Sequence, residues 1–245
     1  MIDLIKIINS LNQSREFLWS WPNQETRKHI PTTEKTEDGV YKTGNEITEP
    51  KSIKITGAIS EGKREETIAK KDEIIAFLNS APLKIFPSNE DRFLYAYLQN
   101  FNSQSIGQAQ IIELELIFLA TDPFFYSEIK TEEKEGKNVL VEVENEGNKK
   151  GLINFEIEFL EEAPMLQVIN QTTEQTLEVE YNFELGQTLR VNNQEQIIRL
   201  DDKNILNSVN EKWLVNELDL TPGVNEIEFN GVEAKFKVLY QSRWF

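Results

Sequence analysis

The sequence has no cysteine and one histidine, His29, among its 245 residues. Without cysteine the chain cannot form disulfides, thiolate nucleophiles, Cys-based zinc sites or iron–sulfur clusters of its own. One histidine cannot build a multi-histidine metal site. A Ser-His-Asp triad would have to use His29, but the sequence contains no G-x-S-x-G nucleophile motif. The sequence therefore predicts no enzyme, with no catalytic residue, no metal site and no cofactor.

Long apolar runs and basic residues are also scarce. No run of 18 apolar residues is present, so we expect no membrane insertion. The start of the chain lacks the basic and apolar segments of a signal peptide, so we expect synthesis in a cytoplasm without secretion. The chain has 26 basic and 42 acidic residues, which give a formal net charge of −16. Nucleic-acid backbones are held by clustered Lys and Arg, so this balance argues against nucleic-acid binding.

What remains is a globular composition, with 39% apolar and 28% charged residues. The length suits one large all-β domain or two domains of ordinary size. Adjacent carboxylates are frequent, but among 42 acids such pairs are typical of a solvated surface rather than of a glycosidase site. A cell-wall hydrolase is therefore the least favoured functional hypothesis.

Hydrophobic periodicity divides the chain into two parts. Residues 63–79 have the period of one amphipathic helix, among several strand-like stretches. Residues 128–138 are charged and nearly free of apolar side chains, which indicates a linker. Beyond them, short strands alternate apolar and polar residues, and Asn230-Gly231 predicts a hairpin, as is typical of an antiparallel sandwich. We therefore predict two domains, at residues 1–132 and 133–245.

Residues 14–50 are polar and turn-rich, which predicts a long loop. Its start nevertheless carries several large apolar side chains, too many for a free linker. Either the sheet of the same domain or a partner must cover them, and both alternatives stay open. The candidate subunit-interface residues are Phe17, Leu18, Trp19 and Trp21.

Two sets of motifs occur in a fixed order. The first closes the first half of the chain and contains Asp122, Pro123, Phe124, Phe125 and Tyr126. The second lies near the C-terminus and contains Trp213, Pro222, Gly223, Asn225 and Trp244. The ordered set resembles the distal tail protein family of siphophages, the siphovirus tail component family, which also occurs in prophages. The resemblance covers nearly the whole chain.

The resemblance implies a mainly β fold with two parts. An N-terminal α+β belt domain of strands plus one helix precedes a C-terminal galectin-like antiparallel β-sandwich. It implies that six copies form a ring, the hub of a tail tip or baseplate. The implied partners are other copies of the chain, the tail tube protein and a tail-tip or tail-associated protein. The implied location is the distal tail of the virion, after synthesis in the bacterial host cytoplasm.

A second functional hypothesis follows from the galectin-like sandwich alone. Such a domain could bind carbohydrates at the host cell surface, although fold analogy is weak support for sugar binding. A galectin-type site also uses a cluster of His, Asn, Arg and Trp on one sheet, and the second domain has no histidine. The structural hub is therefore the favoured prediction.

Overall fold

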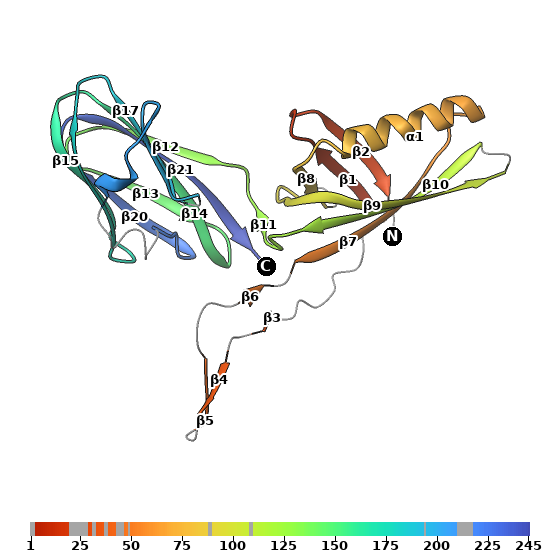
Figure 1. The fold of residues 1–245 in the computed structure, drawn as a ribbon, viewed down its shortest axis with the longest axis horizontal. Helices are drawn as coiled ribbons and strands as arrows, with labels where there is room; N and C mark the ends of the chain where they lie inside the picture. The colour runs from red at the N-terminus through yellow and green to blue at the C-terminus, as the bar shows by residue number, and fades with distance from the viewer. Residues whose placement is uncertain are drawn as a thin grey trace. The chain divides into compact units, whose positions relative to one another are not determined.

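Alternating apolar residues in the first half of the chain form one six-stranded antiparallel sheet in the computed structural model (Figure 1). The chain divides into two units, Met1–Phe125 and Tyr126–Phe245. The structure describes residues 3–19, 29–30, 33–36, 39–42, 47–48, 50–87, 90–107, 110–193, 195–209 and 218–245. The strand order of the first sheet is β2-β1-β8-β9-β10-β7. Its strands are β1 (Asp3–Ile8), β2 (Ser14–Trp19), β7 (Lys51–Ile59), β8 (Leu83–Phe86), β9 (Leu94–Ile106) and β10 (Ile111–Ala120).

Strand β2 lies where the sequence predicted the start of a long loop. That prediction is wrong at its start, because Ser14–Trp19 pairs antiparallel with β1 and turns alternate side chains into the core. Beyond β2 the described backbone contains two short two-stranded ladders, so His29 lies in a strand. These ladders pair β3 (His29–Ile30) with β6 (Ile47–Thr48) and β4 (Thr33–Thr36) with β5 (Gly39–Lys42).

The predicted helix is confirmed as α1, Arg64–Leu78. It contacts β7 and β10 of the sheet (Figure 1). Its buried side chains are Thr67, Ile74, Phe77 and Leu78. The hydroxyl of Thr67 donates to the Lys63 carbonyl at 2.9 Å and accepts from the Glu61 N–H at 3.1 Å. These bonds fix the first turn, while the apolar residues anchor the last turn.

The second unit is built from two further antiparallel sheets. The larger follows the order β11-β21-β14-β17-β18-β19, and β12 also pairs with β21. Its strands are β11 (Phe125–Tyr126), β12 (Lys130–Gly136), β14 (Lys149–Phe159), β17 (Thr188–Asn192), β18 (Ile197–Leu200), β19 (Lys203–Asn204) and β21 (Ala234–Trp244). The smaller has the order β13-β20-β15-β16. Its strands are β13 (Val139–Asn145), β15 (Ala163–Asn170), β16 (Gln175–Phe183) and β20 (Gly223–Asn230), and a short 3₁₀ helix covers Leu206–Ser208.

Side chains from both sheets share one core, which makes this unit a β-sandwich. The rings of Phe159 and Phe183 stack with centroids 4.3 Å apart. Phe236 stacks on Phe155 from its own sheet and on Phe229 from the other sheet, at 5.7 and 5.3 Å. The predicted fold class is confirmed: the chain is mainly β, its described residues include one α-helix, and it ends in an antiparallel sandwich.

The linker predicted over residues 128–138 is wrong, because most of it is strand β12. This strand pairs with β21 and has nearly all its side chains exposed, so it needs no apolar residue. Its acids instead face bases across the pair, with Glu133 opposite Lys237 and Glu135 opposite Lys235. The two structural units meet between Phe125 and Tyr126, ahead of the predicted boundary at 132 and 133.

The hairpin predicted at Asn230-Gly231 is also wrong. Strand β20 pairs with β13 and β15, whereas β21 pairs with β12 and β14 in the other sheet. The turn therefore carries the chain across the sandwich. A Cβ at Gly231 would lie 3.0 Å from the Phe229 ring, so a residue without a side chain suits this crossing.

Candidate functional site

Three of the four candidate interface residues lie on β2. Phe17 and Trp19 are buried, and their rings stack with centroids 4.3 Å apart. Leu18, between them, is 71% exposed. The fourth residue, Trp21, lies outside the described residues. Phe17 and Trp19 therefore pack within their own unit, and Leu18 is the large apolar side chain that β2 presents outward.

Trp19 joins the two end strands of the first sheet. A Cβ built on Gly57 of β7 would lie 2.0 Å from Cδ1 of the indole, far inside van der Waals contact. Only glycine at this position lets the indole lie directly on the β7 backbone. The aromatic content of β2 is thereby explained by packing against the opposite end of its own sheet.

Beside this contact lies an open hollow of about 670 Å³. Leu18 and Trp19 line it together with residues of β7, β9 and β10. Glu115 in the hollow pairs with Lys54 at 2.5 Å. The hydrogen bond from Lys54 holds the pKa of Glu115 below its usual value. The hollow thus combines an exposed leucine with a carboxylate that stays ionised.

The motif at the end of the first unit forms a tight turn. The Asp122 carboxylate accepts the Phe124 N–H at 3.2 Å, an Asx-type turn that pre-organises the following aromatic residues. Pro123 is buried. Phe125 is buried, and the Lys51 ammonium lies 5.5 Å from its ring centroid. Tyr126 is buried in the second unit. The run Asp122–Tyr126 is therefore a structural junction in the chain.

The C-terminal motif contains a buried amide. Asn225 is fully buried, and its Oδ1 accepts the backbone N–H and the hydroxyl of Thr221 at 2.9 and 3.1 Å. Its Nδ2 donates to the carbonyls of Thr221 and Gly223 at 2.8 and 2.9 Å. Gly223 adopts a positive φ of 95°, which favours glycine. The side chain thus closes the turn that leads into β20.

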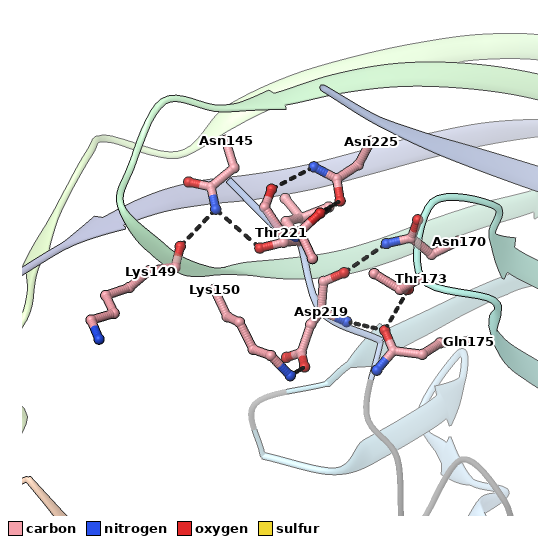
Figure 2. Close-up of polar contacts among 10 residues, drawn as sticks. Asn145, Lys149, Lys150, Asn170, Thr173, Gln175, Asp219, Thr221 and Asn225 are labelled. Carbon is pink, nitrogen blue, oxygen red and sulfur yellow. Dashed lines mark hydrogen bonds and ion pairs between the residues drawn. The ribbon is translucent and has the colours of Figure 1, made fainter. Parts of the chain in front are cut away.

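Asn225 belongs to a larger polar cluster, shown in Figure 2. Asn145 donates to the carbonyls of Lys149 and Leu220 at 2.7 and 3.0 Å. Asn170 donates to the Asp219 carbonyl at 2.6 Å, and the Gln175 side chain accepts the Asp219 N–H at 2.9 Å. These amides come from β13, β15, β16 and β20, and all hold one segment at residues 219–221.

The cluster satisfies every backbone polar group of residues 219–221. Leu220 exchanges both of its backbone hydrogen bonds with Gly151, at 2.7 and 3.4 Å. Asn and Gln side chains satisfy the remaining groups of Asp219 and Thr221. Buried polar groups are costly unless paired, so this complete pairing of the backbone indicates a structural latch. Residues 210–217, including the motif residue Trp213, lie outside the described part.

Pro222 is exposed beside this latch, and Trp244 is half-buried at the end of β21. Sequence reasoning found Asn225 as a motif residue but missed Asn170 and Gln175 as members of the cluster. The available signal was an asparagine at the end of a strand, where an amide can bond to its own turn.

The outer face of the larger sheet carries a row of charges. Glu156 accepts from Arg190 at 3.0 Å and from Lys237 at 3.3 Å. Partial burial alone would raise the pKa of Glu156, but the hydrogen bonds from Lys237 and Arg190 outweigh it, so the pKa lies below its usual value. Such exposed cross-strand pairs add modest stability.

The carbohydrate-binding alternative would need an open aromatic face in the second unit. A polar hollow includes Glu180, Tyr181 and Asn182. The Lys203 ammonium bonds the Tyr181 hydroxyl at 2.8 Å and lies 5.2 Å from the centroid of its ring. The ring is therefore occupied by a neighbouring side chain, and the hollow gives no support for a sugar site.

Within the described residues, no group of three or more Asp, Glu or His side chains could hold a metal ion. In the same part of the chain, α1 is too short and too polar to cross a membrane. What the described residues do offer is two β-units with exposed edges, in which nearly all buried polar side-chain atoms have hydrogen-bond partners. These are the features of a structural protein.

The comparison with protein families specifies this class. Residues 146–244 match the family model described as siphovirus-type tail component, C-terminal domain. The second unit is therefore similar to the C-terminal domain of this family, in agreement with the resemblance noted in the sequence. The matched family is one of phage tail components, and the matched residues all lie within the second unit. No curated protein sequence matched the chain.

Solved structures extend the likeness to the whole chain. The chain resembles the Dit protein of phage SPP1, described as a paradigm of the hub of the adsorption apparatus in phages that infect Gram-positive bacteria. The TM-score is 0.71 at 14% identity, covering 98% of this chain and 99% of that one. A chain of the phage P2 baseplate in its activated conformation matches with a TM-score of 0.56 at 9% identity, covering 99% and 98%. Both units thus share the Dit fold.

Proposed function

We propose that this chain is the hub of a phage tail tip or baseplate, in which six copies form a closed ring that joins the tail tube to the tail tip. The observation that carries the proposal is the likeness to the Dit hub protein over both units, together with the family match of the second. A protein that bridges two assemblies needs rigid surfaces rather than a reactive cleft. The β-units, with their well-packed apolar cores, meet that need.

In this proposal the first domain forms the ring and the second domain projects from it. The partners are the neighbouring copies, the tail tube protein and a tail-tip protein. The location is the distal tail of the virion, after synthesis in the bacterial host cytoplasm. Cyclic symmetry suits this role because a closed ring satisfies each subunit's complementary surfaces without forming fibres. Leu18 and the hollow beside it are candidate contacts between subunits.

The ring is expected to weaken at very low salt. Six copies carry a formal charge of −96, which must be screened. The screening length grows from about 8 Å at physiological salt to about 30 Å at 0.01 M. Light scattering behind size exclusion should therefore detect more 28.4 kDa monomer as salt is removed. An oligomer that keeps its mass, or gains mass, at low salt would contradict this expectation.

A further inference from the structure

Strand β9 extends far beyond its partner β8. Strand β8 pairs with β9 at residues 94–96, whereas β10 pairs with β9 as far as Ile106. Among the residues that the structure describes, no strand pairs with the other edge of β9 over residues 98–106. Residues 99–106 are all exposed, including Phe101 at 38% and Ile106 at 40%. The first sheet therefore carries a long unpaired edge.

One hydrogen bond shows which amides of this edge face outward. The Phe101 N–H donates to the Asn100 side-chain oxygen at 2.8 Å, a partner outside the ladder with β10. Successive residues of an antiparallel strand point their backbone groups to opposite sides. Phe101, Ser103 and Ser105 therefore direct their N–H and C=O groups to the unpaired edge, and Asn102 and Gln104 direct theirs to β10.

Beyond a register shift at Gln99, where Asn100 pairs with Ile117 and Leu98 with Phe118, this edge lacks the usual protection against pairing. Exposed edge strands normally carry charges, proline or bulges that prevent another chain from adding to the sheet. Residues 98–106, LQNFNSQSI, contain no charged residue and no proline, in a chain that is 28% charged. Strand β12 is the internal comparison: also an edge strand, it has five charged residues among seven. The contrast indicates that charged side chains protect the β12 edge from pairing with another strand, whereas the β9 edge has no such charges.

The neutrality of the edge also selects the occupant. Two copies of this chain each carry −16, so their contact is opposed least where the meeting surfaces carry no net charge. A strongly basic partner would instead be met by acidic residues. The same unit has further strand edges as well, because β2 and β7 end the sheet and neither pairs with a further strand among the described residues, although Trp19 of β2 covers β7 at Gly57. An acceptor edge and a donor edge on one subunit are what a head-to-tail ring requires.

We propose that the unpaired edge of β9 at Leu98–Ile106 is the docking surface for a second copy of this chain, which adds a strand to the sheet. The proposal rests on the proposed ring and names the surface that closes it. Main-chain hydrogen bonds to residues 101, 103 and 105 hold the added strand. The added strand also buries part of the exposed Phe101 side chain.

Three single variants of the full chain test this docking surface by their mass in solution. Ser103→Pro removes an outward-facing N–H and is expected to give a folded monomer of 28.4 kDa. Ser103→Ala keeps that N–H and is expected to stay oligomeric, which separates backbone pairing from any role of the hydroxyl. Gln104→Pro breaks a bond to β10 and is expected to lower thermal stability. If Ser103→Pro does not fold, Ser103→Lys, which leaves the backbone intact and adds a charge to the edge, must dissociate the oligomer.

Hydrogen exchange of the wild-type chain supplies the second measurement. The amides of residues 103 and 105 should become at least tenfold slower in the oligomer than in the monomer. If folded Ser103→Pro still forms the oligomer, and the wild-type oligomer lacks this protection, the proposed docking surface is wrong but the proposed ring is not contradicted. A protected dimer supports the docking surface and contradicts the ring. A wild-type chain that is monomeric at every concentration overturns both.

Discussion

Replacing Gly147 with alanine is expected to lower the stability of the second unit by about 4 kcal/mol or more. A Cβ at this position would lie 2.0 Å from the carbonyl oxygen of Arg243. That oxygen belongs to the backbone of β21, so no rotamer change can move it away. The chain must therefore separate β21 from the turn that precedes β14, where Gly147 also donates to Asn145. Urea unfolding followed by circular dichroism measures the loss.

Gly186→Ala is the matched control for this variant. Gly186 lies in the same unit and has a positive φ of 84°, but no atom lies within 4 Å of its Cβ position. Alanine there costs about 1–2 kcal/mol, the penalty for a left-handed backbone without a clash. The steric explanation fails if the two variants have equal stability.

Replacing Asn225 with leucine is expected to cost about 3 kcal/mol. Leucine has a similar volume but cannot bond the Thr221 N–H, the Thr221 carbonyl or the Gly223 carbonyl. Those groups would be left without their partner beside a fully buried side chain. The segment at residues 219–221 should loosen, and hydrogen exchange of Leu220 and Thr221 should accelerate. Calorimetry on the full chain measures the loss of stability.

Two further variants separate the parts of this effect. Asn225→Asp keeps the acceptor for Thr221 but loses the donor to two carbonyls, so it should also destabilise the unit. Asn182→Ala removes an exposed asparagine of β16 and should change stability by less than about 0.5 kcal/mol. If Asn225→Leu resembles Asn182→Ala, the latch does not contribute to stability.

Local periodicity predicted α1 and the alternating strands, because those elements each bury one regular face. It failed where an element buries no face, as in β12, whose charged residues resemble a linker until β21 supplies their partners. It also failed at Asn230-Gly231, because a turn sequence does not specify whether the next strand rejoins the same sheet. In both cases the outcome depends on which distant strands pair, and a short stretch of sequence does not show that pairing.

The candidate site was predictable to a similar extent. The sequence showed that Phe17 and Trp19 must be buried against other residues. The Trp19 indole packs on the backbone at Gly57, which lies far along the chain on the opposite end strand. Asn225 was found through its motif, whereas its function in the latch depends on Thr221, Asn170 and Gln175 converging in space. The unprotected edge of β9 was readable as a neutral stretch, but its lack of a partner follows from the short length of β8.

The central claim, a six-membered ring, is tested most directly by negative-stain imaging of the full chain at physiological salt, with the mass of the same sample measured by light scattering. Six copies of 28.4 kDa give about 170 kDa. We expect that mass and class averages of a closed ring with six-fold symmetry. Monodisperse 28.4 kDa particles at high protein concentration, or an open filament, would contradict the account.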